Sequence, residues 1–592
     1  MIRLRPAWTN PLAAMAACGL ALVSAGSLAD YRADVGYTRL QQELGGALPD
    51  GAGVVVSQIE GVQSVYGQDA WMPDITDGEF AGKTILNVSN ATAGLYSGHA
   101  TGVATDFYGL TSSMAPAITS ISAYAAFDWM GPRYLATTYQ AAGGPTPVVS
   151  TSRIANHSWV ASAPGLDTYV LRRLDWVIET DEFIHVAGLN NGNGSSPSAS
   201  ALLTSAFNVI AVGRSSGQHD TGTAAVDGIY TAGRARPHIV APGNSTSLST
   251  PHVAAAAALL VATGHANAVL SSDPVSVGMT NRAGVVVRNA ERSTVVKAAL
   301  MAGADRVTHN SSEGNLGIYR DVAGNRTANG LDRRYGAGQL NVRNSYLIIA
   351  AGEQGSGEDG GPASSVATRG FDYDPAFGGA SGSNATATYL LPVSAQPQLL
   401  TAALVWNIDV TGPVPPGMGF DTSATLHNLD LLLIDLAAGG ATVAASQGTA
   451  DNTENLWVVV PANAQYALRV IPAGTFSRDY GLAWQLLPDA DGDGAPDERD
   501  NCRAVANGPV LRDAGGNSQL DTNGDGYGNR CDADFNNNGV VDSQDGALLR
   551  VAFGSAGYPD RDLNGNGIVD SQDGALLRVA FGQPPGPSGL VQ

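Results

Sequence analysis

Residues 245–260 read STSLSTPHVAAAAALL, a hydroxyl-rich segment that runs directly into small apolar residues. The apolar run predicts a buried helix, and Pro251 fits its first turn, where no backbone N–H is needed. A serine at the start of such a helix lies at the positive end of the helix dipole. Its backbone N–H is also free to donate to a negatively charged oxygen. This segment therefore predicts serines at a helix N-terminus, a place that suits a nucleophile.

A serine is a weak nucleophile alone, so a base and an orienting acid are expected elsewhere in the chain. The segment SGHATGVA supplies His99 among small residues that let a helix pack closely. The segment GVVVSQIEG reads as a buried strand that ends at Glu60. Asp69 and Asp74 are alternative acids, although neither ends an apolar run.

These segments resemble the motifs of the subtilisin-like serine peptidases. In that family the nucleophile stands four residues before the proline of a Thr-Pro-His-Val-Ala run, which selects Ser247 rather than Ser245 or Ser249. The order acid, histidine, serine is also that of the family. The resemblance implies that Ser247 attacks a peptide carbonyl, that His99 is the general base and that Glu60 orients the imidazole.

The resemblance also implies a side-chain donor for the oxyanion. The segment VAGLNNGNG at 186–194 fits the family pattern and places this donor at Asn190, with Asn191 as the weaker choice. The NHSW segment at 156–159 resembles the strand that pairs with a bound peptide. The resemblance spans about residues 51–350 and implies a parallel-sheet α/β domain.

Several residues depart from the family pattern. Glu60 stands where the family usually has Asp, and Ser245 stands where it has Gly; Leu248 and Ser249 replace the usual Met and Ala. Because two of these departures lie next to the chemistry, an alternative function remains open. Under this alternative, the peptidase domain is catalytically degenerate, and the chain acts as a calcium-dependent extracellular binding or adhesion protein.

The first 29 residues have the features of a signal peptide. Two arginines precede an apolar stretch from Leu12 to Val23, and Ser27-Leu28-Ala29 supplies the small residues that a signal peptidase reads. Cys18 leaves a lipoprotein as an alternative. We expect a secreted, extracellular protein with no membrane segment after signal removal.

A second domain is predicted after a spacer rich in glycine, serine and acidic residues at 353–365. Five short strand-like runs follow between about 370 and 487, and they predict an antiparallel sandwich. The sequence resembles the jelly-roll domain that follows the catalytic domain in some extracellular subtilases, through its Val-Trp strand and the runs HNLDLLLID and DNTEN.

The third region is the most acidic part of a chain whose formal net charge is -21. Residues 489–592 hold 17 Asp and Glu against 7 Lys and Arg. The segments at 489–502 and 521–534 place oxygen side chains at alternate positions around glycines, as calcium requires. They resemble thrombospondin type 3 repeats, a likeness that supports a Cys502–Cys531 disulfide, which a secreted compartment permits. The ligands that this pattern predicts are Asp489, Asp491, Asp493, Asp497, Asp500, Asp521, Asn523, Asp525 and Asp532.

An internal duplication follows at 534–554 and 562–582. Each copy places oxygens at loop positions 1, 3, 5, 9 and 12, a backbone carbonyl at position 7 and a glycine at position 6. A loop followed by one helix, twice, is similar to a dockerin module. The predicted ligands are Asp534, Asn536, Asn538, Val540, Asp542 and Asp545 in the first copy and Asp562, Asn564, Asn566, Ile568, Asp570 and Asp573 in the second.

The partners expected are protein or peptide substrates, Ca²⁺, and a cohesin-like protein for the dockerin-like module, which could equally serve only to stiffen the tail. An acidic chain without a basic patch would repel nucleic acid, so we expect no such partner. The predicted fold is a subtilisin-like α/β domain, an all-β sandwich and a calcium-binding loop-helix module. The predicted segments are 1–29 (signal peptide), 30–50 (N-terminal segment), 51–350 (peptidase), 351–368 (linker), 369–487 (sandwich), 489–533 (thrombospondin-like repeats), 534–582 (dockerin-like) and 583–592 (tail).

Overall fold

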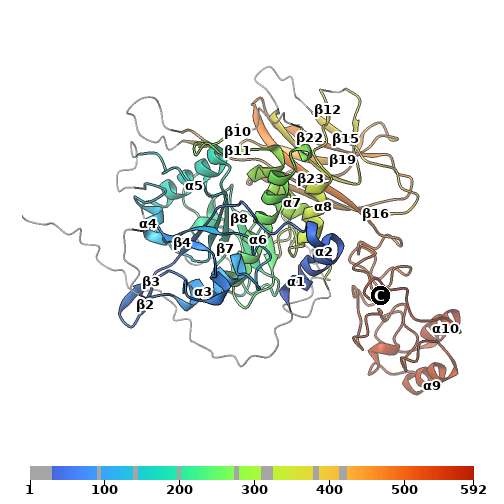
Figure 1. The fold of residues 1–592 in the computed structure, drawn as a ribbon. Coiled ribbons are helices and arrows are strands. Elements are labelled where there is room, and N and C mark those ends of the chain that lie inside the picture. The colour runs from blue at the N-terminus through green and yellow to red at the C-terminus, as the bar shows by residue number, and fades with distance from the viewer. Residues whose placement is uncertain are drawn as a thin grey trace, which may run out of the picture.

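The computed structural model describes residues 30–89, 95–137, 145–163, 165–195, 202–272, 279–308, 324–359, 361–377, 386–412 and 423–591. The predicted signal peptide lies outside these residues. Figure 1 shows an α/β domain, a β-sandwich beside it and a small C-terminal module at the end of the chain. We call these the α/β domain (30–350), the sandwich domain (351–488) and the C-terminal module (489–591).

The α/β domain is built on a seven-stranded sheet in the order β4-β5-β1-β6-β7-β8-β9, and every neighbouring pair is parallel. β1 is buried along its whole length, as expected for a parallel strand covered on both faces. The strands are β1 (Val56–Glu60), β4 (Thr84–Asn87), β5 (Ser120–Ala125), β6 (Ile154–His157), β7 (Ile184–Gly188), β8 (Ile210–Arg214) and β9 (Ile239–Ala241).

Alternate positions of β1 and of β7 face two different cores. Val56 and Val186 pack in the core that contains α3 and α6, whereas Ile59 and Ala187 pack in the core that contains α4 and α5. Helix α6 is long and apolar enough to span a membrane, but 89% of that window is buried inside the domain, where it serves as the core helix. The helices are α3 (Gly98–Tyr108), α4 (Ala126–Met130), α5 (Asp167–Asp181), α6 (Thr246–Ala266), α7 (Ser293–Gly303) and α8 (Val342–Ala350).

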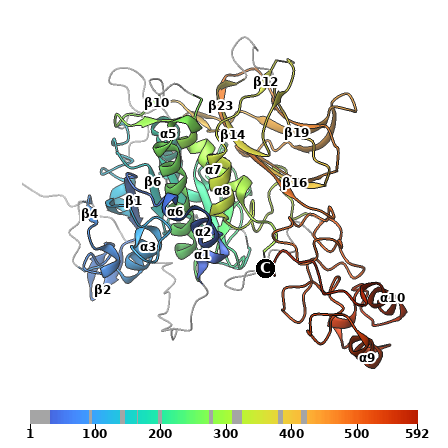
Figure 2. The same ribbon diagram turned by 45° about the vertical axis from the view of Figure 1, so that its right-hand side comes forward.

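The N-terminal segment is part of this core. It forms α1 (Tyr31–Asp34), α2 (Tyr37–Leu44) and the 3₁₀ turn η1 (Gly45–Ala47), and Figure 2 shows it beside α6 and α8. Val35 is completely buried, and the Tyr31 ring stacks on His252 of α6 with the ring centres 3.6 Å apart. The other short elements of the domain are β2 (Gln63–Val65), β3 (Gln68–Ala70), β10 (Met279–Thr280), β11 (Val286–Val287), η2 (Gly78–Phe80), η3 (Leu203–Ser205), η4 (Ala268–Leu270) and η5 (Asn289–Glu291).

The sandwich domain consists of two sheets, one in the order β14-β23-β16-β21 and one in the order β12-β15-β22-β19-β20, with β13 beside β15. Its strands are β12 (Gly357–Glu358), β13 (Ser364–Ser365), β14 (Arg369–Phe377), β15 (Ala387–Leu390), β16 (Gln398–Val405), β19 (Leu429–Asp435), β20 (Ala441–Ser446), β21 (Thr453–Val460), β22 (Tyr466–Pro472) and β23 (Arg478–Pro488), with the hairpin β17 (Asp409–Val410) and β18 (Ala424–Thr425) at its side. The predicted α/β domain followed by a sandwich is confirmed. The expected linker at 351–368 instead holds β12 and β13, which pair with β15 of the sandwich. Their glycine and serine residues have no strand-like pattern, so the sequence did not predict them.

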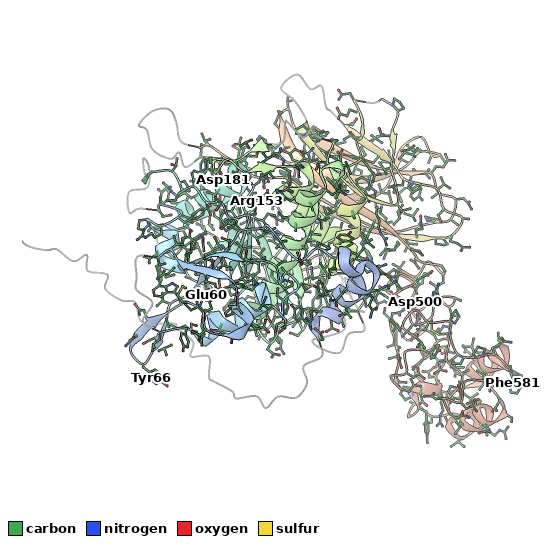
Figure 3. The ribbon with its side chains drawn as sticks, viewed as in Figure 1. Glu60, Tyr66, Arg153, Asp181, Asp500 and Phe581 are labelled. Carbon is green, nitrogen blue, oxygen red and sulfur yellow. A yellow bond between two sulfur atoms is a disulfide. The ribbon has the colours of Figure 1, made fainter. Side chains whose placement is uncertain are left out.

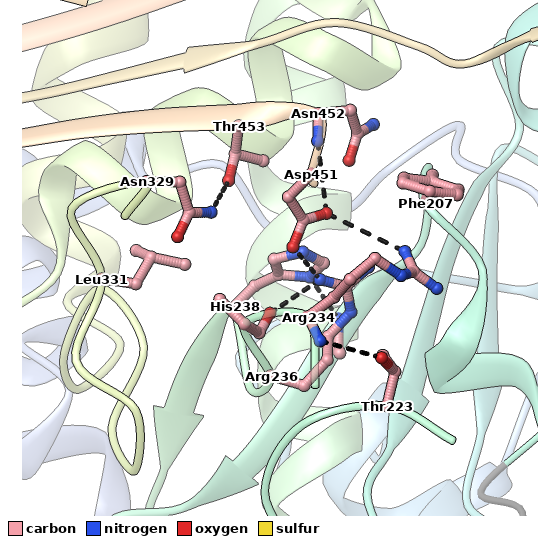
Figure 4. A network of polar contacts seen from close by, with 12 residues as sticks. Phe207, Thr223, Arg234, Arg236, His238, Asn329, Leu331, Asp451, Asn452 and Thr453 are labelled. Carbon is pink, nitrogen blue, oxygen red and sulfur yellow. Dashed lines mark hydrogen bonds and ion pairs between the residues drawn. The ribbon is translucent and has the colours of Figure 1, made fainter. Parts of the chain in front are cut away.

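The sandwich and α/β domains share a core. On the four-stranded sheet, Trp484 and Leu482 face the second sheet, whereas the alternate residue Ala483 packs among the residues of the α/β core. A buried ion pair crosses the same interface: Arg236 Nη1 lies 2.7 Å from Asp451 Oδ2 (Figure 4). Neither side of this interface can be exposed to water without uncovering apolar residues.

The C-terminal module has two helices, α9 (Ser543–Ala552) and α10 (Ser571–Ala580), and the 3₁₀ turn η6 (Pro559–Arg561). Figure 1 shows it below the sandwich and to one side of α2. Ion pairs join its first loop to the α/β domain: Arg499 Nη2 lies 2.6 Å from Asp305 Oδ2, and Arg39 Nη1 lies 3.0 Å from Glu498 Oε2. The predicted Cys502–Cys531 disulfide is confirmed.

Candidate active site and candidate calcium loops

The N-termini of α3 and α6 lie side by side. A Cβ placed on Gly102 of α3 would lie 3.8 Å from Leu248 Cδ2 of α6, and one turn further Asp106 Oδ2 lies 3.5 Å from His252 Nε2. Both pairs have the same separation along the chain, so the two helices run parallel and in register. Small residues on α3 permit this close approach, as its sequence predicts.

This register sets the predicted base and the predicted nucleophile on neighbouring helix N-termini. His99 is the second residue of α3, and Ser247 is the second residue of α6. Glu60 ends β1 directly beneath α3, and its Oε2 lies 3.0 Å from His99 Nδ1. The Glu60 side chain is 2% exposed and that of His99 is 32% exposed. The imidazole is therefore held from the buried side and presents its other nitrogen outward; Figure 3 places Glu60 within the body of the domain.

The electrostatics of this pair favour the charged imidazole. Burial lowers the pKa of His99, but the hydrogen bond to Glu60 and the negative charge of that carboxylate more than offset it, so the pKa lies above 6.5. The neutral form of the imidazole can accept a proton, and the carboxylate stabilises the cation that results.

Ser247 contacts a residue that the sequence interpretation did not single out. Ser158 Oγ donates to the Ser247 carbonyl over 2.8 Å, and Ser247 Oγ lies 3.4 Å from the Ser158 carbonyl. The reason lies in Pro251, which is the sixth residue of α6 and not part of its first turn. Because Pro251 has no N–H, the Ser247 carbonyl lacks its helical donor four residues on and accepts from Ser158 instead. The proline was thus the available signal for this contact.

The two candidate oxyanion donors have different partners. Asn190 Nδ2 donates to Asp220 Oδ2 over 3.1 Å, so its amide already has an acceptor. Asn191 Oδ1 accepts from the Thr246 backbone N–H over 3.0 Å, at the first residue of α6. Of the two, Asn191 is the residue that contacts the helix carrying Ser247.

The backbone around Ser247 leaves a donor free. The N–H groups of Leu248 and Ser249 both donate to the Ser245 carbonyl. Within the described part of the chain, no acceptor is found for the Ser247 N–H, which remains available to an incoming oxyanion.

The replacement of the family glycine by Ser245 is accommodated by the local backbone. Ser245 has φ -150° and ψ 161°, an extended conformation that any residue adopts. The close approach falls instead on Gly243, which has φ +155°. A Cβ on Gly243 would lie 2.7 Å from Ser249 Oγ and 2.8 Å from its nitrogen. The glycine that this turn requires therefore stands two residues earlier.

Among the described residues, the carboxylates of the two alternative acids make no hydrogen bond or ion pair with His99; the Asp74 N–H donates to Thr101 of α3. Asp74 accepts from the N–H and hydroxyl of Thr76 in its own turn, and Asp69 belongs to the β2–β3 hairpin. Figure 3 shows Tyr66 at the tip of that hairpin. Of the three candidate acids, Glu60 is the one whose carboxylate contacts His99.

The four predicted calcium loops share one backbone conformation. In each, the position-6 glycine has positive φ, and its N–H donates to the position-1 aspartate, which curls the chain around that carboxylate. The four glycines are Gly494, Gly526, Gly539 and Gly567, with φ of +89°, +91°, +91° and +95°, and they bond Asp489, Asp521, Asp534 and Asp562 over 3.1, 2.9, 2.6 and 2.6 Å.

The position-12 aspartates of the two repeats close their loops in the same way. Asp545 accepts from Asn536 and Asp542, and Asp573 accepts from the matching Asn564 and Asp570. The position-9 aspartates are turned to the helices that follow: each caps its helix, Asp542 accepting from Gln544 N–H over 2.6 Å and Asp570 from Gln572 N–H over 2.7 Å. The carbonyl-bearing residues Val540 and Ile568 occupy position 7, and their N–H groups donate to Asn538 and Asn566.

The first loop concentrates negative charge in a buried place. Oxygens of Asp489, Asp491 and Asp493 lie within 4.8 Å of one another. Asp491 Oδ2 and Asp500 Oδ2 are both buried and have no hydrogen-bond partner among the described residues. Burial and neighbouring carboxylates raise the pKa of Asp489 to about 7 and that of Asp500 to about 8. Such a group of oxygens fits a hard divalent cation and is costly without one.

The remaining ligands of the first two loops bond within their own segments. Asp497 accepts from Ala490 N–H, and Asn523 donates to Asp525. Asp532 closes the second loop at position 12, and burial raises its pKa to about 7. Every residue predicted to bind calcium thus lies in or beside one of four loops of the same shape.

Comparisons with known proteins give structural matches alone. No protein-family model and no curated protein sequence matches the chain. The serine protease of Aeromonas sobria aligns with 74% of this chain and 89% of its own at 13% identity, with a TM-score of 0.31. The self-cleaved protease domain of PatA covers 52% of this chain and 100% of its own, and the prenylagaramide maturation protease PagA covers 50% and 93%; both are 17% identical with TM-scores of 0.29. These TM-scores are below 0.5, so the conclusions below rest on the chain's own strand order and contacts.

Proposed function

We propose that this chain is a secreted serine endopeptidase of the subtilisin type, which hydrolyses peptide bonds of proteins. The observation that carries the proposal is the 3.0 Å contact between Glu60 and His99 at the paired N-termini of α3 and α6, where Ser247 also stands. A carboxylate, an imidazole and a hydroxyl from three segments far apart in sequence stand at these paired helix N-termini, and they are the three groups that acyl transfer by a serine peptidase uses.

The proposed mechanism is acyl transfer through an ester of Ser247. His99 removes the hydroxyl proton as Ser247 Oγ attacks the scissile carbonyl, and Glu60 stabilises the imidazolium that forms. His99 then returns the proton to the leaving amine, and a water molecule hydrolyses the ester by the same path. The hydrogen bond from Ser158 to the Ser247 carbonyl holds the first turn of α6 during this sequence.

The oxyanion is proposed to accept hydrogen bonds from the Ser247 N–H and from Asn191. The Asn191 carbonyl oxygen is already held by Thr246 N–H, which leaves its NH₂ group for the substrate side. In this proposal Asn190 donates its hydrogen bond to Asp220 and takes no part in binding the oxyanion. Replacing Asn191 with Ala is expected to lower kcat about 100- to 1000-fold. An equal loss in Asn190→Ala and none in Asn191→Ala would return the role to Asn190.

Labelling with a fluorophosphonate tests the nucleophile directly. The calcium-loaded protein should be labelled at Ser247, located by mass spectrometry, and Ser247→Ala should give no adduct. Ser245→Ala is the matched control, because Ser245 is a serine of the same turn whose side chain makes no capping bond. A folded wild-type protein that is not labelled would favour the alternative, a noncatalytic binding protein.

We propose further that the four loops of the C-terminal module bind Ca²⁺. Asp491 and Asp500 support this most directly, because their buried oxygens lack partners among the described residues. The ion would supply the positive charge that lets these carboxylates lie close together. Calorimetric titration with Ca²⁺ should detect binding, and Asp500→Asn should remove one site while the two repeats keep theirs. Equal stoichiometry in both proteins would contradict the first loop as a site.

The duplicated helices are the proposed face for a cohesin-like protein partner. Each repeat exposes the same apolar residues, Val551 with Phe553 and Val579 with Phe581, of which Val579 is 83% exposed. Figure 3 shows Phe581 at the edge of the module. Binding of a cohesin domain should be weakened in a Val579→Asp variant. A stiffening role alone predicts no binding in either protein.

A further inference from the structure

Gln58 lies on the same face of β1 as Glu60, two residues earlier, and is 1% exposed. Its Nε2 donates to Glu60 Oε1 over 2.9 Å and also to the Ala100 carbonyl over 2.9 Å. Its Oε1 accepts from the hydroxyl of Tyr108, at 2.5 Å. This amide therefore joins the carboxylate of β1 to both the first and the last turn of α3.

The direction of the Gln58 amide is fixed by its partners. A phenol hydroxyl of a completely buried tyrosine remains protonated, because burial raises the pKa of Tyr108 well above 10. It must donate, so the group facing it must be the oxygen of Gln58. The NH₂ group then faces two acceptors, Glu60 and Ala100, and a rotated amide would set oxygen against oxygen at both.

Glu60 is held at both of its oxygens. His99 occupies Oε2 and Gln58 occupies Oε1. A glutamate has one more rotatable bond than the aspartate usual in this family, so it needs a second contact to keep one orientation toward the imidazole. Gln58 supplies this contact from within the same strand, and its bond to Ala100 ties it to the residue that follows His99.

We propose that Gln58 is a positioning residue that lets Glu60 act as the acid of the site, with Tyr108 orienting it. This inference rests on the proposed serine peptidase function and names how its unusual acid is kept in place. Gln58 touches neither substrate nor the reacting atoms, and it acts through Glu60.

Several charged groups near His99 can affect its pKa, so a test of Gln58 must leave all of them but Glu60 unchanged. Glu60 faces it from β1. Asp74 lies in the segment whose N–H contacts Thr101, and Asp106 pairs with His252 further along α3 and α6. Of these groups, Glu60 is the one that bonds to Gln58, so a shift in the His99 pKa is expected to report on Glu60.

The first measurement is the His99 pKa, followed by NMR in a Ser247→Ala background, where no catalysis is needed. In Gln58→Leu, Glu60 is free to turn away, and the His99 pKa is expected to fall to the value found in Glu60→Gln. Tyr108→Phe should lower it by less. Gln485→Leu is the matched control, because Gln485 is also completely buried and donates to a backbone carbonyl, but in the sandwich interface. An unchanged His99 pKa in Gln58→Leu overturns the proposal.

The second measurement is a double-mutant cycle on kcat. Gln58→Leu is expected to lower kcat about 10- to 100-fold with little change in KM, the worth of a hydrogen bond to a charged group. The acid limb of kcat/KM should move to lower pH. In a Glu60→Gln background the same change should have no further effect, whereas a merely structural role gives additive losses. Failure of the function itself would show as no wild-type labelling at Ser247, while the NMR result would stand on its own.

Discussion

The buried ion pair between the first two domains allows a quantitative prediction. Arg236 is completely buried, the Asp451 side chain is 4% exposed, and the pair is 2.7 Å apart (Figure 4). Arg234 lies 3.9 Å from the same carboxylate, and the buried Lys297 lies in the same electrostatic environment. Asp451→Asn keeps the shape and removes the charge. Breaking a buried pair in this way costs about 3 to 5 kcal/mol, because the partner charge is left uncompensated.

Urea unfolding at pH 7 measures this change. The fluorescence of Trp406 and Trp484, both completely buried in the sandwich core, reports on the domain that loses the contact. The matched control is Asp409→Asn, because the Asp409 side chain is 47% exposed and its pairing with Arg478, at 3.8 Å, is worth less than about 1 kcal/mol. A loss in Asp451→Asn no larger than that of the control would refute the reasoning.

The pH dependence of the same variant has a definite sign. Burial raises the pKa of Asp451, but the charges of Arg236 and Arg234 lower it by more. The pKa of Asp451 therefore lies below its usual 3.8 in the folded state. A depressed carboxyl pKa contributes stability that is present above the unfolded value and is lost as pH falls through the folded one. The difference in unfolding free energy between wild type and Asp451→Asn should therefore shrink below about pH 4.

Three more outcomes are expected. Gly243→Ala should slow fluorophosphonate labelling of Ser247 about 10- to 100-fold, because the new Cβ meets Ser249 and displaces the first turn of α6; an unchanged rate would exclude that close approach. Chelation with EDTA should expose the C-terminal module to limited proteolysis, read by mass spectrometry, since uncompensated carboxylates would open the loops; identical digestion with and without Ca²⁺ would argue against calcium in them. Replacing Cys502 and Cys531 with Ser should destabilise that module by about 3 to 4 kcal/mol, because the bond closes a loop with a sequence separation of 29 residues. Hydrogen exchange measures this change, and equal protection of the module in the variant and the wild type would show that the loops close without the bond.

Much of the site could be predicted because it is encoded in short segments with a physical signature. The apolar run that ends at a carboxylate predicted a buried strand ending at Glu60. The small residues around His99 predicted a closely packed helix. Ser158 was missed because its role depends on a carbonyl freed four residues before Pro251, which becomes visible only when α6 is known to begin at Thr246. The proline was noticed, but its place in the helix was set one turn too early.

Asn190 and Asn191 show a limit of another kind. Adjacent residues after a strand point in different directions, so the choice between them depends on where the strand ends. β7 ends at Gly188, and the turn that follows sends Asn190 to Asp220 and Asn191 to Thr246. A sequence pattern of the form Asn-x-Gly fits a position to within a residue and cannot determine this direction.

The duplicated segments of the C-terminal module allowed detailed predictions, because both copies repeat the same physical constraints. In both repeats the position-6 glycine donates to the position-1 aspartate. The capping boxes of α9 and α10 are formed by Asp542 with Asp545 and by Asp570 with Asp573. The short strands β12 and β13 escaped prediction for the opposite reason. They consist of glycine, glutamate and serine, and they exist only because β15 presents an edge to pair with.

The two departures nearest the chemistry no longer favour an inactive site. Ser245 is tolerated because its backbone is extended and the close approach has moved to Gly243. Glu60 is longer than the usual acid, yet it reaches His99 at 3.0 Å while Gln58 holds its second oxygen. Gln58 thus compensates for the longer side chain of Glu60, because it holds the second oxygen of the carboxylate that faces the imidazole. Both departures are therefore compatible with the proposed catalysis, because each is matched by a neighbouring residue that keeps the local geometry.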